Sequence, residues 1–99
     1  MSTPGRRSPR STPKPRNPSP DEIAAAILGV LAERDPGKTI CPSEAARRLD
    51  PDHWRRLMTP VREVAKSMVR EGRLEIRRKG EVISPEDARG VIRLALPDG

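Results

Sequence analysis

The stretch VREVAKSMVREGRLEIRRKG, residues 61–80, changes its pattern at Gly72. Before this glycine, apolar side chains recur at the spacing of one helical face: Val61, Val64, Ala65, Met68 and, at the edge, Val69. After it, Leu74 and Ile76 alternate with polar neighbours, which is the period of a strand. Glycine suits the left-handed position that ends a helix. The stretch therefore predicts a helix that ends at Glu71 and a half-buried strand directly after it.

The C-terminal part of the chain repeats the strand pattern. In VIRLAL, residues 91–96, every second side chain is expected to face inward: Ile92, Leu94 and Leu96. The connection KGEVISPEDARG, residues 79–90, is polar and carries turn signals at Lys79-Gly80 and Ser84-Pro85. The two predicted strands therefore form a hairpin, with Val82-Ile83 as a candidate extension.

Three helical segments are predicted upstream of the hairpin. Ser19 with Pro20 and Glu22 makes a capping box in front of the apolar run IAAAILGVLA, residues 23–32. PSEAARRL, residues 42–49, is a second helix, and Lys38–Ile40 before it is an extended link and a candidate short strand. A short helix over HWRRLM precedes Thr59-Pro60, where a threonine cap predicts the start of the third helix.

The order is helix, short strand, helix, helix, strand, polar connection and strand. This order indicates an α+β, mainly helical fold: a winged helix-turn-helix with three helices plus a small antiparallel β-hairpin wing. We assign the winged-helix domain to residues 19–99, and its core is aliphatic because the chain holds one Trp and no Phe or Tyr.

Residues 1–18, MSTPGRRSPRSTPKPRNP, differ in composition from the rest. They contain no acidic residue and no Val, Ile, Leu, Phe or Trp, and their basic residues are Arg6, Arg7, Arg10, Lys14 and Arg16. Such a segment buries too little apolar surface to offset its ordering entropy. We predict a disordered, Pro/Arg-rich basic tail, which either adds nonspecific affinity for phosphates or serves as a solubilising extension.

The charge of the remaining chain is unevenly spread. The tail accounts for five of the six net positive charges, so the rest of the chain is nearly neutral. Residues 36–79 carry twelve bases against six acids, whereas residues 21–35 and 80–99 are net acidic. A basic central stretch fits an anionic partner, and the alternative is a solvated charged face.

Cys41 is the single cysteine, and His53 is the single histidine. A zinc site needs about four ligands, and a nucleophile needs an oriented base, so neither chemistry is favoured. We interpret Cys41 as the cap of a helix that begins at Pro42, with the Glu44 carboxylate accepting from the backbone N–H of Cys41. We therefore expect no enzyme, no cofactor and no small-molecule ligand.

The apolar run of residues 23–32 is too short to cross a bilayer. It is followed by Glu33-Arg34-Asp35 rather than by small residues, which favours a core helix over a secretion signal. A single cysteine also excludes an internal disulfide and fits a reducing compartment. These features predict a cytoplasmic protein with no membrane contact.

The segments TICPSEAARRL, WRRLMTPVREVA, EGRLEI, KG and RGVIRL lie between Ile23 and Leu96. Together they resemble a small bacterial family, the domain-of-unknown-function family 3253. The resemblance implies a winged-helix-like fold and supplies no catalytic residues. The matching positions are Thr39, Cys41, Pro42, Ser43, Glu44, Ala46, Arg47, Trp54, Arg55, Met58, Val61, Arg62, Ala65, Gly72, Gly80, Gly90 and Arg93.

Nine residues are candidates for binding nucleic acid: Arg55, Arg56, Arg62, Lys66, Ser67, Arg70, Arg77, Arg78 and Lys79. The first two suit backbone phosphates, the next four lie on the outward side of the third helix beside the acidic Glu63, and the last three lead into the wing. Three alternatives remain open. Arg77, Arg78 and Lys79 either contact DNA as a wing or form a solvated hairpin edge. Arg62 either contacts DNA or is braced by Glu44, whose other possible partner is Arg47. Trp54 either fills the core between two helices or is exposed for stacking.

The fold order and the basic central stretch predict a winged-helix nucleic-acid-binding protein. Double-stranded DNA is the expected ligand and transcriptional regulation the expected role. The alternative is a protein–protein interaction or homodimerisation module on the same scaffold, which the acidic first helix and the nearly neutral domain favour.

Overall fold

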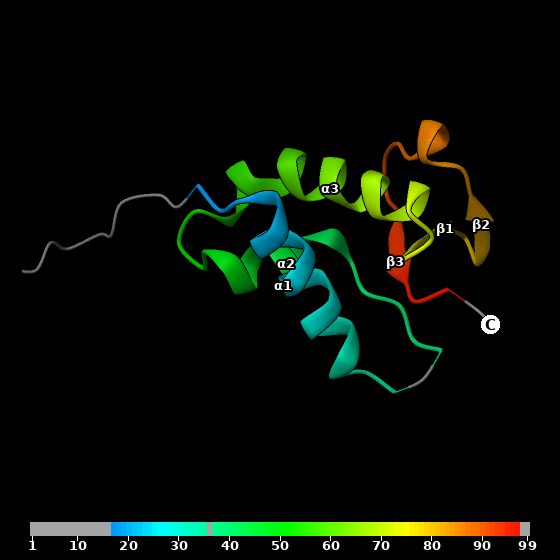
Figure 1. Cartoon of the computed structure of the whole chain (residues 1–99), viewed down its shortest axis with the longest axis horizontal. Coiled ribbons are helices and arrows are strands. Elements are labelled where there is room, and N and C mark those ends of the chain that lie inside the picture. The colour runs from blue at the N-terminus through cyan, green and yellow to red at the C-terminus, as the bar shows by residue number, and fades with distance from the viewer. Residues whose placement is uncertain (1–16, 36, 98–99) are drawn as a thin grey trace, which may run out of the picture.

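The structure is a computed structural model that describes residues 17–35 and 37–97 (Figure 1). Its elements, in chain order, are α1 (Pro20–Ala32), α2 (Pro42–Leu49), the 3₁₀ helix η1 (Trp54–Leu57), α3 (Met58–Arg70), β1 (Glu75–Arg78), β2 (Glu81–Ile83), the 3₁₀ helix η2 (Pro85–Asp87) and β3 (Arg93–Ala95). The predicted mainly helical α+β fold, consistent with a winged-helix arrangement, is confirmed. The tail predicted over residues 1–18 lies outside the described residues except for Asn17 and Pro18.

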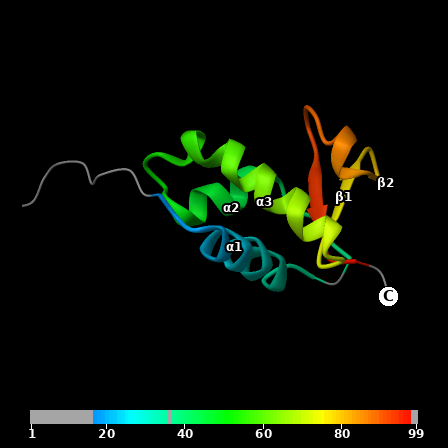
Figure 2. The same ribbon diagram turned by 45° about the horizontal axis from the view of Figure 1, so that its top comes forward.

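The three helices pack together, and the sheet lies beside the C-terminal end of α3. Figures 1 and 2 both show this arrangement from different directions. α1 contacts both α2 and α3, which makes the helical layer, and β1 follows α3 directly. The wing, defined here as residues 79–92, runs from the end of β1 to the start of β3 and includes β2 and η2.

The predicted capping box of α1 is confirmed. The Ser19 hydroxyl accepts a hydrogen bond from the Glu22 backbone N–H at 3.2 Å, and the Glu22 carboxylate accepts from the Ser19 N–H at 2.8 Å. Pro20 occupies the first helical turn, where its missing N–H leaves nothing unpaired. α1 then buries Ile23, Ile27 and Leu31 on one face.

The predicted start of α3 at Thr59 is wrong. The 3₁₀ helix η1 ends at Leu57 and α3 begins at Met58, so helical backbone already precedes Thr59. A threonine there has no helix N-terminus to cap. The predicted end is confirmed: Glu71 is the C-cap, and Gly72 has a φ of 77°, the left-handed conformation that glycine adopts without strain.

The sheet has the strand order β2-β1-β3, and all its pairs are antiparallel. Ile76 of β1 faces Ile83 of β2 on one side and Leu94 of β3 on the other. Ile40 adds an antiparallel bridge to Leu94, with N–H to oxygen distances of 2.9 and 2.7 Å. The link before α2 therefore occupies the edge next to β3, as the short strand of a winged helix does.

The hairpin between β1 and β2 turns through two residues. Lys79 has a φ of 53° and Gly80 a φ of 83°, and this pair of positive values characterises the type I′ turn that fits strand twist. The predicted extension of the hairpin by Val82-Ile83 is confirmed, since both residues belong to β2.

The core is aliphatic, and its largest fully buried side chains come from every layer: Ile23, Ile27, Ile40, Met68, Leu74, Ile76, Ile92, Leu94 and Val61. One predicted inward residue is wrong. Leu96 is 50 % exposed, whereas Ala95 is 2 % exposed. β3 ends at Ala95, so the alternation does not extend to Leu96, and Ala95 lies in a hollow that Leu31 of α1 also lines.

Ile76 tests this packing because it is fully buried between two neighbouring strands. We expect Ile76→Val to lower the free energy of unfolding by about 0.5–1.5 kcal/mol, since one buried methylene is lost. Val82→Ala, in the exposed strand β2, is the matched control and is expected to change it by less than about 0.5 kcal/mol. Urea denaturation measures both; equal effects would contradict the core described above.

Candidate nucleic-acid interface

The outward face of α3 carries two of the predicted cations one turn apart. Lys66 lies 3.3 Å from the Glu63 carboxylate on the same helix, and Arg70 lies 3.7 Å from the Glu86 carboxylate of η2. Glu63, Glu86 and Arg70 are largely exposed, and exposed pairs of this kind contribute only about 0–1 kcal/mol. Arg70 can therefore exchange its carboxylate for a phosphate at little cost, whereas the Lys66 side chain is half-buried, with 25 % of it exposed. Ser67 is also exposed, on the side of α3 that faces α1.

Arg62 acts as an internal brace, although not through the predicted partner. Its Nη2 atom donates to the carbonyl oxygen of Gly90 at 2.8 Å, so α3 holds the wing. Glu44 instead pairs with Arg34 and accepts from the backbone of Cys41. The predicted pairing of Glu44 with Arg62 or Arg47 is therefore wrong, because the segment after α1 brings Arg34 to that carboxylate first.

The two arginines at the end of β1 also form contacts within the chain. Arg78 donates from Nη1 to the carbonyl oxygens of Asp87 at 3.2 Å and Arg89 at 3.4 Å, which ties the end of β1 to the returning segment. Arg77 is half-buried and donates to the Glu75 carboxylate at 3.0 Å. Lys79 differs, since it stands exposed at the tip of the hairpin turn. Of these three predicted DNA contacts, Lys79 is the one whose side chain has no described hydrogen bond or ion pair.

Trp54 is half-buried, and it packs against the core while two guanidinium groups lie over its ring. The Cζ atom of Arg47 is 4.4 Å from the ring centroid, and that of Arg55 is 4.6 Å from it. Each such cation–π contact contributes about 0.5–1 kcal/mol at an exposed position. Trp54 thus partly fills the predicted core position and also orders two arginines. Arg56 is exposed beside them.

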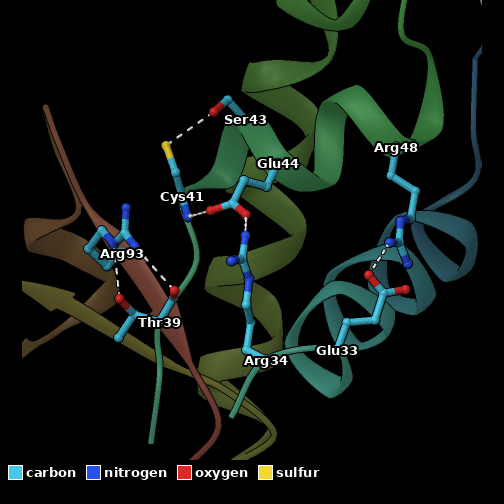
Figure 3. Close-up of polar contacts among 8 residues, drawn as sticks. All are labelled: Glu33, Arg34, Thr39, Cys41, Ser43, Glu44, Arg48 and Arg93. Atoms are coloured by element: carbon cyan, nitrogen blue, oxygen red, sulfur yellow. Dashed lines mark hydrogen bonds and ion pairs between the residues drawn. The ribbon is translucent and has the colours of Figure 1, made fainter.

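The start of α2 is held by a set of polar contacts, drawn in Figure 3. The Glu44 carboxylate accepts from the Cys41 backbone N–H at 2.8 Å, which confirms the predicted capping by Glu44, and its other oxygen pairs with Arg34. Nearby, Arg93 of β3 donates to the hydroxyl and carbonyl oxygens of Thr39 at 2.9 and 3.1 Å. These contacts join α1, α2 and the sheet around the bridge at Ile40.

A second ion pair joins α1 and α2. Arg48 donates to the Glu33 carboxylate, and this hydrogen bond lowers the pKa of Glu33 and raises that of Arg48 from their ordinary values (Figure 3). Both side chains are largely exposed, so the pair is expected to contribute little to stability. Its role is to fix the two helix ends beside each other.

The Cys41 thiol lies in a mixed environment. Burial raises its pKa, but the Ser43 hydroxyl at 3.2 Å, the Ser43 backbone and the positive charges of Arg93 and Arg62 lower it, and the net pKa lies below the ordinary value of a thiol. Among the described residues, no group of three or more His, Cys, Asp or Glu side chains is placed to bind a metal. Within the same ranges, no helix has the length and apolar character that a membrane span requires.

Comparison with known families gives one match. The family model described as a protein of unknown function, DUF3253, matches residues 20–97. The chain belongs to the DUF3253 family. This confirms the resemblance carried by the motifs from Ile23 to Leu96, and the matched range runs from the first residue of α1 past the end of β3. No curated protein matches the chain significantly.

In this DUF3253 chain the nine predicted interface residues fall into three groups rather than one patch. Arg55 and Arg56 lie on η1, and the α3 group comprises Arg62, Lys66, Ser67 and Arg70. Arg77 and Arg78 end β1, and Lys79 begins the wing. Sequence reasoning missed Arg47, which reaches Trp54 across the turn between α2 and η1. Since no regular helix joins these two residues, no periodic pattern could have paired them.

The thiol environment gives a prediction. We expect iodoacetamide to alkylate Cys41 with a half-maximal rate at a lower pH than an ordinary exposed thiol, because the pKa of Cys41 is lowered and thiolate forms earlier as pH rises. Ser43→Ala should move that pH upward by removing a hydrogen bond to sulfur. Ser67→Ala is the control. If the alkylation rate of Cys41 in the unsubstituted chain depends on pH as that of an ordinary thiol does, the described environment is contradicted.

The brace between Arg62 and Gly90 gives another prediction. We expect Arg62→Met to speed amide exchange of the wing residue Ala88 about fivefold, since a hydrogen bond of about 1 kcal/mol is lost. Lys66→Met, on the same helix, is the control because Lys66 pairs only with Glu63 of α3 among its described contacts. Hydrogen exchange by NMR measures both; unchanged exchange in the Arg62 variant would refute the brace.

Proposed function

We propose that this DUF3253 protein binds double-stranded DNA, with the outward face of α3 in the major groove. The observation that carries the proposal is the position of Lys66 and Arg70, one turn apart on the exposed face of the third helix. In winged helices this helix follows the turn and enters the groove. Arg suits guanine and phosphate, and Lys suits both as a point charge. Ser67, on the side of α3 toward α1, could serve as donor or acceptor only at the edge of this surface.

Contacts to the DNA backbone would flank this helix. Arg55 and Arg56 precede α3 directly, and Lys79 stands at the tip of the hairpin beyond its other end. Such contacts set the register of a protein on the duplex without reading its sequence. The basic tail of residues 1–18 would add affinity in the same nonspecific way.

The remaining predicted residues receive a supporting role in the proposal. Arg62 and Arg78 donate hydrogen bonds to carbonyl oxygens of the wing, and Arg77 donates to the Glu75 carboxylate. They would hold the wing in place rather than contact DNA. The proposal assigns no catalytic role to any residue. It describes a bacterial protein that regulates transcription in the cytoplasm, because bacterial duplex DNA lies in that compartment.

Exposed apolar residues support a second candidate function, protein–protein interaction or homodimerisation. Val82, Val91 and Leu96 are 60 %, 82 % and 50 % exposed, and all three belong to the C-terminal half that carries the sheet. β2 also forms an outer strand of the described sheet. These residues lie outside α3, so substitutions on the sheet and on α3 distinguish the two functions.

A salt titration tests DNA binding. We expect the full chain to bind duplex DNA with an affinity that falls linearly on a log–log plot against salt, because released counterions drive binding. Lys66→Ala combined with Arg70→Ala should reduce the magnitude of that slope by about two, because each substitution removes one cation that would contact a phosphate.

The control replaces two cations outside the proposed interface, Lys38 and Arg73, with alanine. It removes the same net charge and should leave the slope nearly unchanged. No binding by the full chain at low salt would refute the proposal. Equal slope changes in the two double variants would refute the assignment to α3.

A further inference from the structure

Trp54 gathers side chains from two elements around one indole ring. Arg47 belongs to α2, whereas Trp54 and Arg55 belong to η1, and residues 50–53 turn the chain between them. Both guanidinium carbons lie over the ring, at 4.4 and 4.6 Å from its centroid. The aromatic ring therefore has two positive charges beside it at the point where the chain enters α3.

The stacked arginines differ from the other arginines that contact the rest of the chain. Hydrogen bonds or ion pairs to carboxylate, hydroxyl or carbonyl oxygens occupy Arg34, Arg48, Arg62, Arg70, Arg73, Arg77, Arg78 and Arg93. Among the described residues, no such contact involves Arg47, Arg55 or the adjacent Arg56. The N–H donors of these guanidinium groups have no described oxygen acceptor, and two of the groups are held beside one ring. Their donors are thus available for a ligand.

The charge at this place also points to an anion. Two like charges beside one ring repel each other, and neither forms a described ion pair, although Asp52 lines the same surface hollow as Trp54 and Arg55. A phosphate group would relieve that repulsion and accept from both planar donor sets, as arginine–phosphate pairs commonly do. The indole lowers the ordering cost of such a contact because both side chains are already positioned.

We infer that Trp54 holds Arg47 and Arg55 as a clamp for a backbone phosphate of duplex DNA. This inference rests on the proposed function and adds two residues to its interface: Arg47 as a contact and Trp54 as a positioning residue. The guanidinium groups occupy the ring, so Trp54 does not stack on a base. The contact is made to the backbone and carries no sequence preference.

The first test removes the charges. Arg47→Ala combined with Arg55→Ala is compared with Lys38→Ala combined with Arg73→Ala in the full chain, by salt titration on two duplexes of unrelated sequence. The clamp variant should reduce the magnitude of the salt slope by about one on both duplexes, because one phosphate contact is lost, and the control should not. Equal slopes in the two variants would overturn the clamp while leaving DNA binding intact, whereas no binding by the unmodified chain would overturn both.

The second test keeps the charges and changes the ring. Trp54→Phe retains an aromatic face and should retain most of the affinity at fixed salt. Trp54→Leu keeps apolar packing but removes the cation–π contacts, and it should weaken binding several-fold. Thermal unfolding of both variants separates folding from positioning. If the affinity for DNA falls in proportion to thermal stability in both the Phe and the Leu variant, Trp54 has a purely structural role and the inference is overturned.

Discussion

The antiparallel bridge between Ile40 and Leu94 is the contact on which the rest of the fold depends. Both side chains are fully buried, and their backbones exchange two hydrogen bonds across 54 residues of chain. The bridge fastens the segment between α1 and α2 to the last strand, and Arg93 reinforces it by bonding Thr39. Because β3 also pairs with β1, the bridge joins the link between α1 and α2 to the sheet, while α3 contacts β1 and η2 directly. Together with the hydrogen bond from Arg62 to Gly90, the bridge fixes where the wing stands relative to α3.

The arginines of this small domain divide into two kinds, and the division shapes the functional account. Some are used inside the fold: Arg62 and Arg78 tie the wing to α3 and to itself, and Arg34 completes the start of α2. Others, such as Arg47 and Arg55, have no described carboxylate partner and rest on an aromatic ring. A net basic stretch therefore overstates the charge that is available to a ligand. Availability follows from what each guanidinium already contacts.

Local chemistry made much of the fold predictable, whereas contacts between distant segments did not. The change of period at Gly72 located the end of α3 and the start of the sheet, and Ser19 located α1. Leu96 was misplaced because a strand's alternation says nothing about where pairing stops. The partner of Arg62 was also misplaced, since Gly90 lies 28 residues away and reaches it only after the wing folds back. For the same reason, the sequence predicted candidate interface residues but did not show which of them form contacts within the fold.

Residue-level mapping of DNA binding by NMR tests the central claim most directly. In a titration of the full chain with a duplex, the account predicts that the largest amide shifts fall on η1 and on the outward face of α3, around Arg55, Lys66 and Arg70, with smaller shifts at the hairpin tip. Shifts confined to residues 1–16 would assign binding to the tail alone and contradict the account. So would shifts centred on Val82 and Val91, which would identify the sheet as the interface.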